Sequence, residues 1–326
     1  MRPLISYKWK LLNNWTDLYM KNLFSFFSNY SNKKIISFDG GGVRTIASLV
    51  FLKKLEAESG KKVSDVFDMF VGTSAGAFNA ACFAFGGFSA EKVKRYWSEA
   101  YLERIMKTSF FWDKASLIQA RPRYESEGRI EVLKEIFGKN TIAESNKPFL
   151  SLAYDIEKRK HVVFDSLNTP DISFVDAIAS SSAAPMYFPT HQMEDESWMI
   201  DGSIVTNNPT LIGQAYAKEI LETENIKIFS IGSGQNKNKI SGPSSSKWGG
   251  MGWLRNDIMG MLLDSEIHND ISKDLFKDNY LRVNSPRGKI NKFLDDYSDE
   301  NLEQIHLMGM EWWSKFGDDT LKFIDD

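Results

Sequence analysis

Ser74 lies in the pentapeptide Gly72-Thr73-Ser74-Ala75-Gly76, between an apolar run typical of a buried strand and a small-residue run typical of a helix. A serine on a sharp strand-to-helix turn projects its hydroxyl above the sheet edge, where it can attack a carbonyl carbon. The flanking glycines let strand and helix approach closely, and the helix N-terminus faces the charge that develops. The G-x-S-x-G pattern in this context predicts a nucleophilic serine.

A second motif, Asp39-Gly40-Gly41-Gly42-Val43-Arg44, follows the run KKIISF. Three successive glycines leave backbone N–H groups open to an anion, and in acyl transfer that anion is the oxyanion of the tetrahedral intermediate. We therefore predict that the three glycine amides form an oxyanion hole. Arg44 would brace the loop, meet a phosphate, or pair with Asp39. A nucleotide-phosphate loop is disfavoured, because G-x-x-x-x-G-K-[ST] is absent and G-x-G-x-x-G fails at Thr45.

Asp201 is the third candidate group. The tripeptide Asp201-Gly202-Ser203 follows the apolar run WMI, so an acid stands at a strand end beside a small residue. Such a carboxylate can reach across a sheet edge and accept the proton of a serine hydroxyl. An exposed aspartate, with a pKa of about 3.9, is a weak base at neutral pH. A base at this position therefore requires a desolvated carboxylate that is hydrogen-bonded to Ser74.

Histidine offers a different base. The order Ser74, Asp201, His268 is that of the α/β-hydrolase triad, so a Ser-His-Asp esterase of non-lipid esters stays open as an alternative. Against it, the HGGG-type oxyanion loop of such esterases is absent. The chain also has no H-E-x-x-H, no cysteine cluster and no EF-hand loop, so neither a metal nor another cofactor is expected.

Strand-like and helix-like runs alternate along the chain, which predicts an α/β fold with a mostly parallel central sheet covered by helices on both faces. We expect strands in 33–39, 65–73, 197–201, 226–234 and 279–284 and a hairpin over 148–166. We expect helices over 45–60, 75–85, much of 89–140, 174–190 (ended by Pro185), 210–221, 253–279 and 299–324, and a flexible Ser/Gly loop over 237–252.

The first 32 residues differ in composition from the rest. Aromatic residues are frequent among Lys and Asn over 7–30, and Leu11, Trp15, Leu18 and Tyr19 fall at helical spacing. This predicts an amphipathic helix that lies on a bilayer or packs against the domain. We therefore divide the chain into an N-terminal extension, residues 1–32, and a catalytic domain, residues 33–326.

Composition excludes several classes of protein. A net charge of −3 and a pI near 5.9 disfavour nucleic acid as a partner. The single cysteine, Cys82, excludes an internal disulfide and suits a reducing compartment. No signal peptide or membrane-spanning run is apparent, so we expect a cytoplasmic protein, with peripheral membrane contact left open.

Taken together, DGGGVR, GTSAG and DGS resemble the motifs of the patatin-like phospholipases, DGGGxRG, GxSxG and DG[GA], in order and approximate spacing. DAIASSSAAPMYFPT over 176–190 and the run FSIGSG resemble two further segments of that family. The likeness covers residues 33–315. Thr45 stands where the family has glycine, and Ser203 where it has glycine or alanine.

This resemblance implies a patatin-like three-layer sandwich and a Ser74–Asp201 dyad without histidine. Oxyanion donors would come from Gly40, Gly41 and Gly42, and no cofactor would be needed. The implied activity is that of a phospholipase A or lysophospholipase on membrane glycerolipids. A non-catalytic lipid-binding module on the same scaffold is an alternative. The residues that would support the motifs are Asp39, Arg44, Gly72, Gly76 and Gly202.

An acyl chain also needs an apolar cleft. Its candidate lining residues lie in FAFGGF at 83–88, in FFW at 110–112, and at Met186, Tyr187 and Phe188.

Overall fold

The computed structural model describes residues 32–108, 121–237, 239–256, 260–261 and 265–325. The predicted N-terminal amphipathic helix and the proposed lining residues 110–112 lie outside these ranges.

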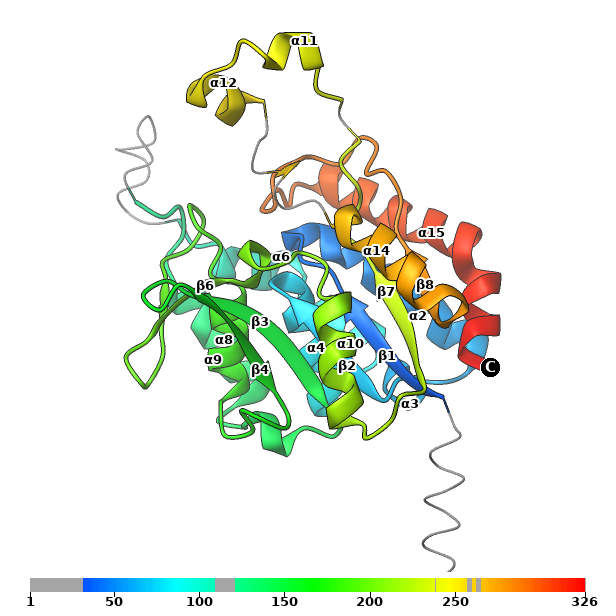
Figure 1. The fold of residues 1–326 in the computed structure, drawn as a ribbon. Coiled ribbons are helices and arrows are strands. Elements are labelled where there is room, and N and C mark those ends of the chain that lie inside the picture. The colour runs from blue at the N-terminus through cyan, green and yellow to red at the C-terminus, as the bar shows by residue number, and fades with distance from the viewer. Residues whose placement is uncertain (1–31, 109–120, 238, 257–259, 262–264, 326) are drawn as a thin grey trace, which may run out of the picture.

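Among the described residues, eight strands form one mixed sheet, in the order β5-β6-β3-β2-β1-β7-β8, with β4 also paired to β3 (Figure 1). The neighbours from β3 through β2, β1 and β7 to β8 are parallel, whereas β4, β5 and β6 add antiparallel pairs. The strands are β1 (Lys33–Phe38), β2 (Met69–Thr73), β3 (Phe149–Asp155), β4 (Lys160–Asp165), β5 (His191–Gln192), β6 (Trp198–Asp201), β7 (Ile226–Ile231) and β8 (Tyr280–Val283).

Helices cover both faces of this sheet. Successive side chains of a strand point to opposite faces, so apolar residues on both faces must be buried against helices. Ile36 and Phe70 pack on the face covered by α2, α4, α9 and α15, and Ile35, Met69 and Val71 pack on the face covered by α10. The predicted three-layer α/β fold is confirmed. The helices are α2 (Ile46–Ser59), α3 (Val63–Val66), α4 (Ala75–Gly86), α5 (Ala90–Arg95), α6 (Glu99–Ile105), α8 (Glu127–Phe137), α9 (Phe174–Ser181), α10 (Thr210–Ile220), α11 (Gly242–Ser245), α12 (Gly250–Arg255), α14 (Glu266–Phe276) and α15 (Asp299–Asp325).

Short 3-10 turns connect several of these elements: η1 (Gly42–Thr45), η2 (Ile142–Glu144), η3 (Gly202–Ile204) and η4 (Lys277–Asn279). In the part of the chain that the structure describes, no helix combines the length and apolarity needed to cross a bilayer.

Three predicted elements were wrong in detail. The helix expected to run from residue 174 until Pro185 terminates it ends earlier, at Ser181. The carbonyl of the next residue, Ser182, accepts a hydrogen bond from the buried Arg129, and Ala184, before the proline, is disfavoured in helical backbone. The run expected as strand from residue 65 begins as α3, and β2 starts only at Met69. The segment expected as a flexible loop, 237–252, contains α11 and the start of α12, and α11 is capped by the Ser241 hydroxyl.

A buried ion pair joins two residues that are far apart in the sequence. The Arg282 guanidinium, on β8, donates to both carboxylate oxygens of Asp39, with nitrogen–oxygen distances of 2.8 and 2.6 Å. It also donates to the Ser230 hydroxyl and to Glu266, so both charges are compensated. Of the three alternatives for Arg44, pairing with Asp39 is wrong, because Asp39 pairs with Arg282; the Arg44 Nε donates to the Gly41 carbonyl at 3.2 Å, as expected if Arg44 braces the loop.

We predict that Arg282→Met lowers the free energy of unfolding by about 3–5 kcal/mol, because it leaves the Asp39 carboxylate buried beside fewer donors. Urea unfolding would measure this loss. The matched control is Lys61→Met, which removes the surface partner of Asp325 and should cost less than about 1 kcal/mol. Equal small losses in both variants would contradict the prediction.

Candidate active site

Ser74 occupies a strained turn between β2 and α4. Its backbone has φ 55° and ψ −126°, a conformation that residues with side chains rarely adopt. The turn is tight because glycines line it. A methyl group added to Gly72 would lie 2.3 Å from the Gly76 carbonyl oxygen, and one added to Gly76 would lie 2.5 Å from the Phe38 carbonyl oxygen. Both glycines therefore allow the close packing that exposes the serine hydroxyl.

The Ser74 hydroxyl donates a hydrogen bond to Asp201, with an Oγ–Oδ2 distance of 2.6 Å. The second carboxylate oxygen accepts the backbone N–H of Ser203 at 2.8 Å. Asp201 is buried, and this burial raises the pKa of its carboxyl above the usual value, although the hydrogen bonds from Ser74 and Ser203 and the charge of Arg129 oppose the shift. The arrangement meets both physical conditions for a base: desolvation and contact with the serine.

The turn after α9 contacts both members of this pair. The Ser74 N–H donates to the Ser181 hydroxyl at 2.9 Å, and the Asp201 N–H donates to the Ala183 carbonyl at 3.1 Å. Arg129 of α8 donates to the carbonyl and to the hydroxyl of Ser182, between these two contacts. We call residues 181–183 the serine bracket, because it fixes the backbones of Ser74 and Asp201 relative to each other.

Arg129 was missed by the sequence analysis, although a signal was present. It falls on the apolar stripe of α8 with Val132, Leu133 and Phe137, where a charged residue is unusual. Its guanidinium lies 4.4 Å from the centre of the Phe188 ring. Burial lowers the pKa of Arg129 to about 10, and the nearby Asp201 opposes this shift, so the group carries its charge at neutral pH.

The glycine loop lies against the same site, with one difference from expectation. The Gly40 N–H donates to the Asn207 carbonyl at 3.0 Å, so it is engaged within the fold. The amides of Gly41 and Gly42 make no hydrogen bond to any described residue and remain as candidate oxyanion donors. Gly42 has φ +58°, and a methyl group there would lie 2.0 Å from the Leu294 carbonyl oxygen. That carbonyl accepts the Val43 N–H at 2.9 Å and holds the loop in place.

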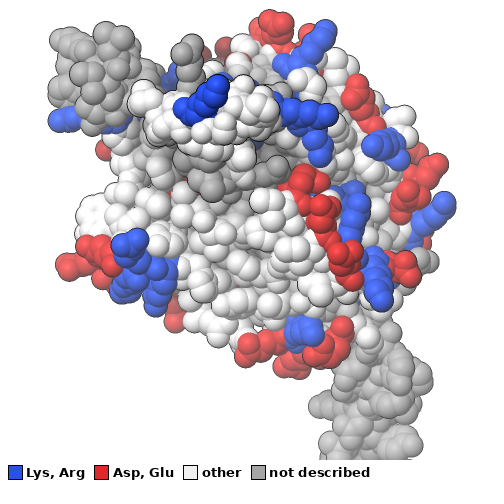
Figure 2. All heavy atoms as spheres, turned by 45° about the horizontal axis from the view of Figure 1, so that its top comes forward, with Lys and Arg blue, Asp and Glu red and all other residues white. Residues whose placement is uncertain are grey.

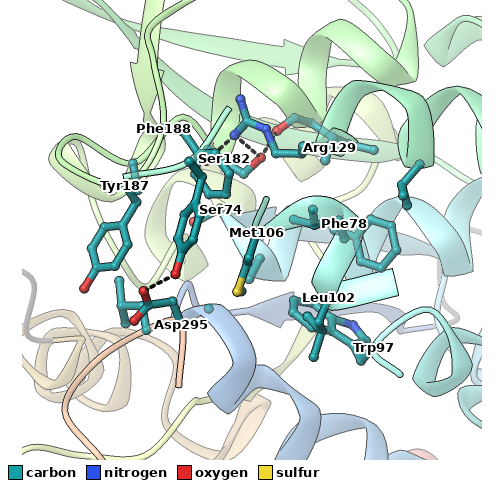
Figure 3. A pocket seen from close by; sticks show the side chains of 18 of the residues that line it. Ser74, Phe78, Trp97, Leu102, Met106, Arg129, Ser182, Tyr187, Phe188 and Asp295 are labelled. Atoms are coloured by element: carbon teal, nitrogen blue, oxygen red, sulfur yellow. Dashed lines mark hydrogen bonds between the residues drawn. The ribbon is translucent and has the colours of Figure 1, made fainter. Parts of the chain in front are cut away.

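An apolar pocket of about 100 Å³ opens beside Ser74 (Figure 3). Phe188 and Arg129 lie on one side of it, and Leu102 and Trp97 lie on the other. The predicted lining residues Tyr187 and Phe188 are correct.

Other predicted lining residues were wrong. Met186 points to solvent and does not line the pocket, and residues 83–88 do not line it, because Phe83 lies in the core. Asp295 was not anticipated at all. It lies in the pocket wall and accepts a hydrogen bond from the Tyr124 hydroxyl at 2.5 Å.

Comparison with known proteins decides the family. A family model described as patatin-like phospholipase matches residues 36–213, more than half of the chain. The chain belongs to the patatin-like phospholipase family. It is 27% identical over 328 residues to Patatin-like protein 4 of Arabidopsis thaliana, covering 84% of this chain and 82% of that protein. It is 24% identical over 326 residues to patatin of Solanum tuberosum, with the same coverage.

Among solved structures, the chain is similar to VipD from Legionella pneumophila, with a TM-score of 0.47 and 13% identity over 87% of this chain and 67% of that one. Membership of the patatin-like phospholipase family supports lipid acyl hydrolysis as the general activity.

Two histidines of the chain bond to partners other than Ser74 and Asp201. His268 Nδ1 contacts the Thr206 hydroxyl at 3.1 Å, and His191 pairs with Asp176 at 3.0 Å. Across the ranges that the structure describes, no histidine hydrogen-bonds to Ser74 or Asp201, and no group of three potential metal ligands gathers. The geometry therefore favours the carboxylate as the partner of the serine.

We predict that Gly42→Ala lowers turnover at least tenfold, because its methyl group would collide with the Leu294 carbonyl and displace an oxyanion donor. Steady-state kinetics on a soluble short-chain ester would measure the effect. Gly288→Ala is a matched control, since Gly288 also has a positive φ of +59° but has nothing within 4 Å of an added methyl group. It pays only the backbone cost, about 1 kcal/mol of stability, and should keep full turnover. An equal loss of turnover in both variants would count against the loop's role.

Proposed function

We propose that this protein is a phospholipase A-type or lysophospholipase-type hydrolase that cleaves carboxylic esters of membrane glycerolipids with Ser74 and Asp201. The observation that carries this proposal is the 2.6 Å hydrogen bond between the serine hydroxyl and a buried carboxylate, at the mouth of an apolar pocket. Family membership supports the lipid substrate. Residues 33–326 would form the catalytic domain, with residues 1–32 as an extension.

In the proposed reaction, Asp201 accepts the Ser74 proton as Oγ attacks the ester carbonyl carbon. The carbonyl oxygen becomes an oxyanion, to which the Gly41 and Gly42 amides and the N-terminus of α4 would donate. The bond to the glycerol oxygen then breaks, and the leaving alcohol takes the proton from Asp201. Water, activated by the same carboxylate, hydrolyses the acyl-enzyme and regenerates Ser74.

The pocket and Arg129 support distinct parts of this scheme. The apolar walls match an acyl chain, whose burial stabilises the complex. The Arg129 cation favours the ionised form of Asp201, which is the form that accepts a proton. The serine bracket supports the short distance between the two groups.

We predict that Ser74→Ala and Asp201→Asn each lower turnover by about 10³-fold or more, because each removes a member of one catalytic unit. The substrates are a phospholipid with a labelled acyl chain in vesicles and a soluble short-chain ester. His268→Ala, which lies outside this unit, should stay within about threefold of wild type.

Two results would overturn the dyad in favour of the alternatives. An inactive His268→Ala with an active Asp201→Asn would indicate a Ser-His-Asp esterase. An inert wild type that still binds vesicles would indicate a non-catalytic lipid-binding module.

We also predict the pH dependence. Only ionised Asp201 accepts a proton, so kcat/KM should be maximal above its pKa and should fall as the pH drops through that value. Because burial raises this pKa, the acid limb should lie above the value of about 3.9 for an exposed aspartate. Measurement of kcat/KM against pH with the soluble ester would test this, with His268→Ala as the control. An acid limb that disappears in His268→Ala would assign the base to histidine.

A further inference from the structure

Three large apolar side chains are exposed on segments that also supply residues of the site. Met186, Ile204 and Phe293 are 53%, 43% and 50% exposed. They come from separate segments, yet each is close in sequence to a site residue. Met186 precedes the pocket residue Tyr187, Phe293 precedes the pocket residue Leu294, and Ile204 follows Asp201 by three positions. We call these three residues the apolar rim.

The backbone beneath the rim is fixed by hydrogen bonds. The Met186 carbonyl accepts a hydrogen bond from the Arg123 N–H at 3.0 Å. The backbone of Met186 has a φ of 73°, which a residue other than glycine adopts only under strain. The Leu294 carbonyl, next to Phe293, holds the glycine loop, and Ile204 lies in η3. The backbone positions of the three rim residues therefore depend on segments that also contribute to the site.

Further apolar groups lie at this end of the molecule. Figure 1 shows α11 and α12 projecting beyond the end of the sheet at which β1 and β2 finish. Met251 of α12 is 80% exposed, and the Trp248 and Trp253 rings lie edge to face at 5.3 Å. Figure 2, with this end turned forward, shows a broad uncharged area with most of the Lys, Arg, Asp and Glu at its margins.

We propose that the apolar rim docks the protein on the surface of a lipid bilayer, with the pocket mouth facing the lipids. The proposal rests on the proposed function, since a lipid hydrolase must draw its substrate from such a surface. Exposed Met, Ile and Phe side chains insert at the boundary of headgroups and acyl chains. Lys292 beside Phe293 and Lys247 beside Trp248 would reach the headgroups, as lysine does at interfaces. A protein partner on the rim would instead cover the route by which an acyl chain enters.

The test uses the full chain with Ser74→Ala, so that binding is measured without hydrolysis. Vesicles contain equal parts of phosphatidylcholine and phosphatidylglycerol, and sedimentation gives the partition coefficient. Met186→Asp with Phe293→Asp should lower this coefficient about tenfold for each side chain, because each loses its apolar contact and adds a charge. The matched control is Leu167→Asp, 46% exposed just after β4. Asp165 pairs with Leu150 near the start of β3, so Leu167 lies at the opposite end of the sheet and should leave binding within twofold.

A second readout separates docking from catalysis. With Ser74 intact, the double rim variant should hydrolyse a soluble short-chain ester at the wild-type rate but lose turnover of vesicle phospholipid by the same factor as binding. Unchanged vesicle binding, an equal loss in Leu167→Asp, or a rim that mediates only dimerisation would overturn the proposal. If wild type hydrolyses nothing while vesicle binding still depends on the rim, docking stands and the proposed function fails. Should the aspartates unfold the protein, Met186→Ser with Phe293→Ser repeats the test.

Discussion

The site depends on one hydrogen bond between two strands that lie end to end along the same edge of β3. β2 pairs with β3 as far as Leu152, and β6 pairs with the residues that follow, Ala153–Asp155, while β4 occupies the other edge of β3. Thr73 pairs with Leu152, and Asp201 pairs with the next residue of β3, Ala153. The end of β2 therefore meets the end of β6, and two short side chains are enough to join Ser74 to Asp201. The strained backbone of Ser74 then turns its hydroxyl toward the carboxylate.

Burial of charge both creates reactivity and requires compensation. Asp201 is a stronger base because it is desolvated, and its charge is matched by donors from Ser74 and Ser203 and by the Arg129 cation. Asp39, equally buried, is compensated by direct contact with Arg282, which suits a structural role. The two aspartates are buried to a similar extent but face different groups. Asp201 faces the hydroxyl of Ser74, which can give up a proton, whereas Asp39 faces the guanidinium of Arg282.

Much of this architecture follows from local sequence patterns. The alternation of runs predicted the layered α/β fold, and the motifs around Ser74, Asp201 and the glycine loop predicted which groups would meet. Such reasoning failed where distant segments interact. Three features depend on tertiary contacts. Asp39 pairs with Arg282, and the Gly40 amide donates to the Asn207 carbonyl. Helix α9 ends early at Ser181, where Arg129 donates to the next carbonyl, that of Ser182. Arg129 could have been identified from the sequence, because a charged residue on the apolar stripe of a helix needs a buried partner.

The contacts that hold the glycine loop show how much of the chain the site needs. The family model matches residues 36–213, yet the Leu294 carbonyl, well beyond that range, accepts a hydrogen bond from Val43 in the loop. Arg282, also beyond it, pairs with Asp39 at the start of the loop. A fragment limited to residues 36–213 would contain Ser74 and Asp201 but would lack both Leu294 and Arg282. The smallest piece worth transplanting or redesigning thus reaches past β8, beyond the residues that the family model matches.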